Sequence, residues 1–64
     1  MDFAVKVKLP RHGRNEYITD IHVKNIKDDK NQAIREAINY INRAHWLRLS
    51  DIEKTKLIFE VKTL

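Results

Sequence analysis

Hydrophobic and polar residues alternate near the start of the chain. From residue 3 to residue 9 every second position is apolar, and two lysines stand between: Phe3, Val5, Val7 and Leu9 alternate with Ala4, Lys6 and Lys8. Successive side chains of a β-strand point to opposite faces of the sheet. The pattern therefore predicts a strand that buries one face and presents lysines on the other.

A second alternating stretch covers residues 17–23. The segment before it, residues 10–15, contains Pro10 and Gly13 and is predicted to be a hairpin loop, in which Pro10 ends the first strand. In the second strand we assign the more apolar set to the core and the other set to the opposite face. The two sets are Tyr17, Thr19, Ile21 and Val23, and Ile18, Asp20, His22 and Lys24.

An amphipathic helix is predicted next. Asp29 is a good N-cap, Gln32 three residues later suits a capping box, and Asp28 and Asp29 fit the positive end of the helix dipole. Apolar residues then recur at spacings of three and four, which marks the buried side of a helix. This stripe consists of Ile34, Ala37, Ile38, Ile41 and Ala44.

The same helical geometry predicts where the helix ends. At about 100° per residue, Arg48 would fall in the middle of the apolar stripe, and burying an unpaired arginine is costly. The helix should therefore end around residues 45–47. Leu49 and Ile52 are then expected to pack under the sheet from a loop that turns at Ser50 and Asp51.

Residues 56–63 alternate a third time and predict the last strand. Leu57, Phe59 and Val61 point one way, and Ile58, Glu60 and Lys62 the other. A hairpin, a helix and a returning strand, joined by a right-handed crossover, give an α+β fold of the order β-β-α-β. Its three-stranded antiparallel sheet has the order 2-1-3, and one helix covers one face. The 64 residues are expected to form a single domain, 1–64.

Composition limits the setting in which such a domain works. The chain has no cysteine, so neither disulfides nor thiolate metal sites can stabilise its small core. No apolar run approaches the roughly 18 residues of a membrane span, and the first residues lack a signal-peptide pattern. We expect a cytoplasmic protein that does not enter a membrane.

A net charge of +4 directs attention to the uncovered face of the sheet. Basic residues of the strands and the hairpin loop are expected there: Lys6, Lys8, Lys24, Lys62, Arg11 and Arg14. Such a face attracts DNA or RNA through the phosphates. However, Ile18 and Ile58 stand at its predicted centre, where nucleic-acid sheets usually carry stacking aromatics. An ordinary solvated face, with lysines opposite carboxylates, is the alternative.

The polar side of the helix is a second candidate surface. Arg35, Asn39, Asn42 and Trp46 follow one another at spacings of four, three and four. A tryptophan beside arginines has the composition of an interface anchor. The alternative is that the helix ends before Trp46 and the ring seals the end of the core. Small domains rarely expose their only tryptophan, which favours this alternative.

The edges of the sheet are a third candidate. The last strand ends at Leu64 without a following segment to cover it, so it could pair with a partner strand or a second copy in a homodimer. Lysines at Lys54, Lys56 and Lys62 would oppose such pairing.

Signs of catalysis are weak. The three histidines, His12, His22 and His45, lack metal-ligand spacing, and Ser50 has no evident histidine base. His12 between Arg11 and Arg14 could move protons near a phosphodiester, but a basic loop with one histidine is usually only a loop. We expect no enzyme, no metal and no cofactor.

Three short motifs of this chain resemble the Dmd antitoxin family of T4-type phages, small proteins that neutralise bacterial RNase toxins. They are Val5-Lys6-Val7, Lys27-Asp28-Asp29 with Gln32-Ala33, and the Lys-rich approach to Phe59-Glu60-Val61. The resemblance implies a small phage-type inhibitor and assigns no functional residue. With the absence of catalytic groups, it favours a non-enzymatic regulator that binds a host protein. A nucleic-acid-binding protein is the alternative.

Overall fold

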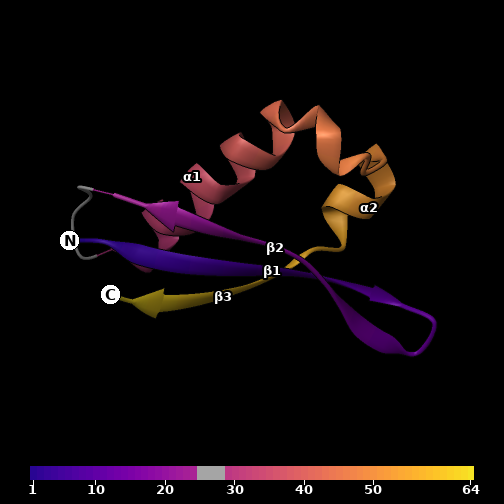
Figure 1. Cartoon of the computed structure of the whole chain (residues 1–64), viewed down its shortest axis with the longest axis horizontal. Helices are drawn as coiled ribbons and strands as arrows, with labels where there is room; N and C mark the ends of the chain where they lie inside the picture. Colours follow the sequence, from indigo (N-terminus) through magenta and orange to yellow (C-terminus); the bar gives the residue numbers. More distant parts are fainter. Residues whose placement is uncertain (25–28) are drawn as a thin grey trace.

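The computed structural model describes residues 1–24 and 29–64. Figure 1 shows the order of the elements along the chain. They are β1 (Phe3–Arg11), β2 (Arg14–Val23), α1 (Lys30–Arg43), the 3-10 turn η1 (His45–Leu47), α2 (Asp51–Thr55) and β3 (Ile58–Thr63). Lys27 and Asp28, which belong to the predicted entry into the helix, lie outside the described residues.

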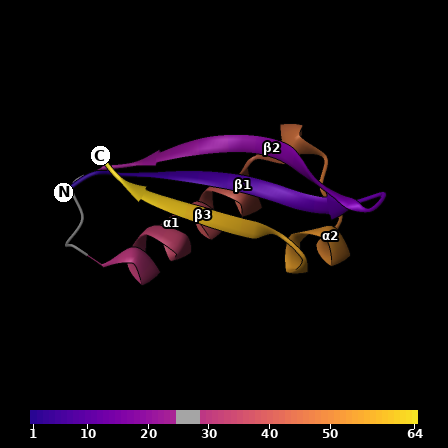
Figure 2. The same ribbon diagram turned by 90° about the horizontal axis from the view of Figure 1, so that it is seen from below.

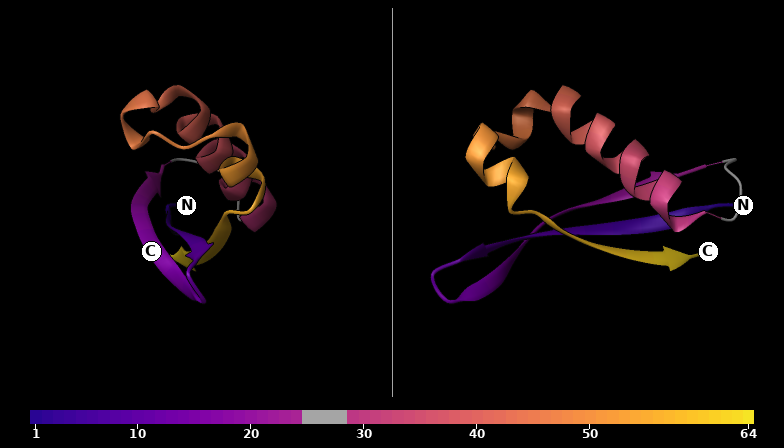
Figure 3. Two further views of the ribbon diagram at one scale, coloured as in Figure 1. Left: turned by 90° about the vertical axis from the view of Figure 1, so that its right-hand side faces the viewer. Right: turned by 180° about the vertical axis from the view of Figure 1, so that it is seen from behind.

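The three strands form one antiparallel sheet in the order β2-β1-β3. Both helices lie on the same side of this sheet and leave its other face open, as the two views of Figure 3 show. The predicted α+β fold and strand order are confirmed. Since β1 is the central strand, its alternating residues decide which side of the sheet is the core.

The core lies between β1 and α1. Phe3, Val5 and Val7 are fully buried, and the first turns of α1 pack on them through small side chains. Alanines bring the helix backbone close to the sheet, which suits a domain with little volume to fill. The whole cluster comprises Phe3, Val5, Val7, Ile21, Val23, Ala33, Ala37 and Ile41.

The hairpin between β1 and β2 is tighter than predicted. The turn consists of His12 and Gly13, whose φ angles of 52° and 78° are the positive pair that a type I′ turn requires. Both strands therefore continue through the segment assigned to a loop, and Pro10 does not end β1. Pro10 is tolerated because its missing N–H would point toward the β3 side, where β3 pairs only as far as Lys8.

Because of a β-bulge in β2, some residues of this strand lie on the opposite face of the sheet from the one predicted. Val7 pairs with Thr19 but Lys8 pairs with Tyr17, so Ile18 is an extra residue in the ladder. Beyond this point every side chain changes face. Ile18 packs against the core, and Tyr17, predicted to be in the core, is 56% exposed.

Helix α1 begins where the sequence predicts and ends slightly earlier. The Asp29 carboxylate accepts hydrogen bonds from the backbone N–H groups of Asn31, at 2.9 Å, and Gln32, at 3.4 Å. The buried side is centred on Ala33, Ala37 and Ile41. The observed buried side is thus displaced by about one residue from the predicted stripe. Ile38, which belongs to the predicted stripe, is 41% exposed.

The segment after α1 is more ordered than the predicted loop. Arg48 adopts a left-handed conformation with φ 54°, and Leu49 packs against the core as expected. Ser50 then starts α2 with a full capping box to Glu53. Because α2 turns its first residues outward, Ile52 is 69% exposed and does not pack under the sheet.

Replacing the α1 N-cap should measurably destabilise the fold. Asp29→Ala removes the acceptor of two backbone N–H groups, and we expect the free energy of unfolding to fall by about 1 kcal/mol. Denaturant unfolding followed by circular dichroism measures this loss. Asp29→Asn keeps a capping oxygen and should lose much less; equal losses in both variants would contradict a capping role.

Candidate functional site

The open face of the sheet carries lysines and carboxylates in alternation. Lys6 of β1 stands opposite Asp20 of β2 on one side and Glu60 of β3 on the other. Lys8 is paired with Glu60, with 3.0 Å between its Nζ atom and Oε2. The predicted positive face is therefore a face of mixed charge, which weakens its attraction for phosphates.

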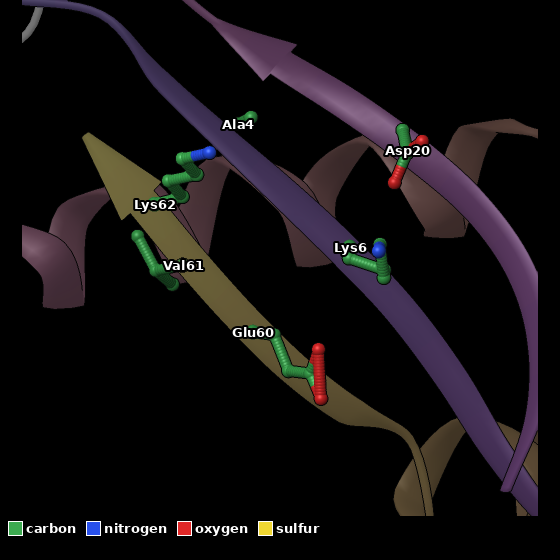
Figure 4. A pocket seen from close by; sticks show the side chains of 6 residues that line it. All are labelled: Ala4, Lys6, Asp20, Glu60, Val61 and Lys62. Atoms are coloured by element: carbon green, nitrogen blue, oxygen red, sulfur yellow. The ribbon is translucent and has the colours of Figure 1, made fainter. Parts of the chain in front are cut away.

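A shallow hollow of about 310 Å³ lies over the centre of this face. Figure 4 shows Lys62 reaching from β3 toward the small side chain of Ala4, while Lys6 stands between Asp20 and Glu60. Both carboxylates border the hollow, so an anion placed there would meet repulsion as well as attraction. Lys6, Lys62 and Lys24, which follows β2, remain exposed as predicted.

Arg11 does not lie on the open face, which corrects its predicted place there. By the alternation of β1 it shares the covered side with Leu9, and its guanidinium bonds the carboxylates of Glu53 in α2 and Glu16 in β2. Arg11 thus ties the hairpin to α2. Arg14 stands opposite Arg11 in the ladder and is exposed on the hairpin.

Glu53 is the centre of this small network. Its carboxylate accepts the Ser50 backbone N–H at 2.9 Å as well as the Arg11 guanidinium. Hydrogen bonds from Ser50 and then from Arg11 favour the ionised form, and lower the pKa of Glu53 from 4.5 to about 2. The same bond from Arg11 is the main cause that raises the pKa of Arg11.

Tyr17 is a surface residue that the sequence pattern did not reveal. The bulge turns it onto the open face beside Lys8, where its hydroxyl donates to Asp20 Oδ2 at 3.0 Å. This hydrogen bond is the main reason that the pKa of Tyr17 is raised above 10.0. Among the described residues, the open face therefore carries one aromatic ring, and Ile18, predicted at its centre, is on the other side of β2.

On the helical side, the predicted strip divides between two elements. Arg35, Asn39 and Asn42 are exposed on α1. Trp46 lies in η1, after the helix has ended, and is 66% exposed. The expectation that its ring seals the core is wrong, because Leu47 and Leu49 occupy the inward positions next to it.

Among the described residues, no three His, Cys, Asp or Glu side chains are grouped closely enough to hold a metal ion. No helix in the described parts of the chain is long and apolar enough to cross a membrane.

Comparison of the chain with protein-family models, with curated protein sequences and with solved structures found no match. The resemblance to the Dmd antitoxins thus stays a prediction from the sequence.

The ionised carboxylate of Glu53 should stabilise the fold at neutral pH and should lose this effect in acid. Because folding lowers the pKa of Glu53 from 4.5 to about 2, its contribution is complete above about pH 5 and is lost as the pH falls from 4.5 toward 2. Unfolding by urea at a series of pH values measures it. The stability difference between wild type and Glu53→Gln should shrink across that range.

A matched control is Glu36→Gln, which removes an exposed glutamate of α1. The effect of Glu53→Gln is compared with the effect of this variant at each pH. A Glu53→Gln difference that stays constant from pH 7 to pH 2 would contradict the Arg11–Glu53 pairing.

Proposed function

We propose that the protein is a non-enzymatic binding protein that docks on a host protein through Trp46, as a small regulator or inhibitor of the kind carried by phages and mobile elements. The observation that carries this proposal is the 66% exposure of the only tryptophan. A large aromatic side chain held in water gains most when a partner pocket covers it.

The backbone around Trp46 is held in place before any partner arrives. The N–H of Leu47 donates to the Ala44 carbonyl at 3.0 Å, and the N–H of Arg48 donates to the His45 carbonyl at 3.1 Å. Ala44 is buried and Leu47 packs on the core. A fixed turn with an exposed ring loses little conformational entropy on binding, which favours affinity.

The surroundings of Trp46 indicate the chemistry of the partner. Arg43 precedes it at the end of α1 and Arg48 follows it, and both are exposed. A complementary surface has an apolar pocket for the ring and carboxylates at its rim. The resemblance to small phage inhibitors supports this class of function, although it assigns no residue.

Binding to a purified partner tests the role of Trp46. The partner is first isolated from host lysate on the immobilised protein and identified, and its affinity is then measured by calorimetry. Trp46→Ala should weaken binding by about 2 kcal/mol or more, roughly 30-fold. As the chain has a single tryptophan, its fluorescence should also shift toward shorter wavelength on binding.

Leu64→Ala is the matched control. Leu64 is a similarly exposed apolar residue, at the end of the chain marked C in Figure 1, away from η1. Its removal should leave the affinity unchanged. Equal binding by wild type and Trp46→Ala, or failure to recover any host protein, would reject the proposal.

Nucleic-acid binding is a second candidate, and the position of Tyr17 is the observation in its favour. The bulge supplies an aromatic ring near Lys6 and Lys8 on the open face. A mobility-shift titration at increasing salt separates the two candidates, because phosphate contacts weaken steeply with salt. Binding that is lost in both Tyr17→Ala and Lys6→Glu would support this second candidate, and no shift at low salt would remove it.

A further inference from the structure

The two edges of the sheet are not equally accessible. Figures 2 and 3 show the beginning of α1 in the helical layer, projecting past the outer edge of β3, so that this layer overhangs the β3 edge. In Figure 2, no helix of the described chain projects beyond the outer edge of the half of β2 that ends at Val23, although α1 borders that half from the helical layer. The β3 edge, which the sequence favours for pairing, is thus the one that the helical layer overhangs.

A hollow of about 210 Å³ runs beside this part of β2. It is bordered by the end of the strand, from Ile21 to Lys24, and by Glu36, Tyr40 and Arg43 of α1. As an outer strand of the sheet, β2 has one edge along which a further strand can pair. Strand addition at such an edge is a common mode of protein association.

The backbone groups that β2 offers follow from the ladder. The N–H of Leu64 donates to the Asp2 carbonyl at 3.0 Å, so even-numbered residues of β1 bond to β3 and odd-numbered ones bond to β2. Ile21 and Val23, opposite Val5 and Phe3, therefore point their N–H and C=O groups inward. Those of Asp20, His22 and Lys24 point to the free edge.

The charged side chains along the edge of β2 indicate the kind of strand that can pair with it. On the open face, Glu60, Lys6 and Asp20 form a row of alternating charge across the three strands. The next position, beyond Asp20, favours a cation. Lys24 lies four residues further along the same edge, and His22 stands midway between Asp20 and Lys24.

We propose that β2 pairs antiparallel with β2 of a second copy, with the two-fold axis at His22. In this register each His22 faces His22 of the second copy, and each Asp20 faces Lys24 of the second copy. All three positions are ones whose backbone groups point outward, so the hydrogen-bond pattern and the charges agree. Two three-stranded sheets then join into one continuous sheet with the helices on one side.

Other registers interrupt the ladder, oppose like charges or lose the Asp20–Lys24 pairs. A two-fold axis at Asp20 places two carboxylates opposite each other, and an axis at Val23 loses both Asp20–Lys24 pairs, because Lys24 then faces His22. An axis at Ile21 brings Lys24 against the bulge at Ile18, where the ladder is interrupted. The ring of His22 bonds Asp2 of its own chain, at 3.1 Å.

Charge reversal tests this register directly. By sedimentation equilibrium, the wild type should move from a mass of 7.7 kDa toward twice that value as its concentration approaches about 1 mM. Asp20→Lys and Lys24→Asp should each abolish the dimer, since each places like charges opposite one another. An equimolar mixture of the two variants should restore it, because both contacts of the mixed pair then join opposite charges.

The restored mixture distinguishes lost pairing from a damaged fold, and circular dichroism of each variant checks the fold independently. Lys62→Asp, on β3 at the other edge of the sheet, is the control that should dimerise like the wild type. A wild type that stays monomeric at about 1 mM overturns the proposal. So does a dimer that both single variants retain, or one that the mixture fails to restore.

Cysteine cross-linking provides a second readout, because the chain has no cysteine of its own. Paired residues at the axis have Cα atoms about 5.5 Å apart, within reach of a disulfide. His22→Cys should cross-link under mild oxidation many times faster than Lys62→Cys. Equal rates for the two variants would place the interface elsewhere.

Discussion

The burial of the odd-numbered side of β1 is the interaction on which the rest of this structure depends. Phe3, Val5 and Val7 meet Ala37 and its neighbours on α1, and the other strands add to this contact from either side. A chain of 64 residues has one main helix with which to cover the sheet. The even-numbered side of β1 is consequently left on the open face, where Lys6 and Lys8 can keep their charged groups in water.

The strand order and the central place of β1 could be predicted because they depend on period-two alternation, which short-range patterns record well. What could not be predicted depends on single-residue events. The two-residue turn at His12 required a non-glycine residue with positive φ, and the bulge at Ile18 reversed the facing of Tyr17. Neither the turn nor the bulge produces a repeating pattern of residues from which it could be predicted.

The candidate surfaces were predicted less well than the fold, for a related reason. In the sequence, Lys8 and Arg11 have the appearance of unpaired cations. The fold, however, brings Glu60 to Lys8 and Glu53 to Arg11, and both carboxylates lie more than forty positions away along the chain. Pairing between distant residues cannot be read from local composition. The exposure of Trp46 likewise follows from η1, which turns Leu47 inward and leaves the ring outside.

The distribution of charge bears on how this protein recognises a partner. Carboxylates accompany the lysines of the open face, and Glu16 and Glu53 accompany Arg11 on the covered side. Each of these pairs offsets a positive charge, and Asp20 opposite Lys6 lowers the concentration of positive charge on the open face further. Long-range attraction of a polyanion needs such concentration. The proposed recognition therefore depends more on close contacts, and among the described residues the ring of Trp46 is the largest exposed apolar side chain.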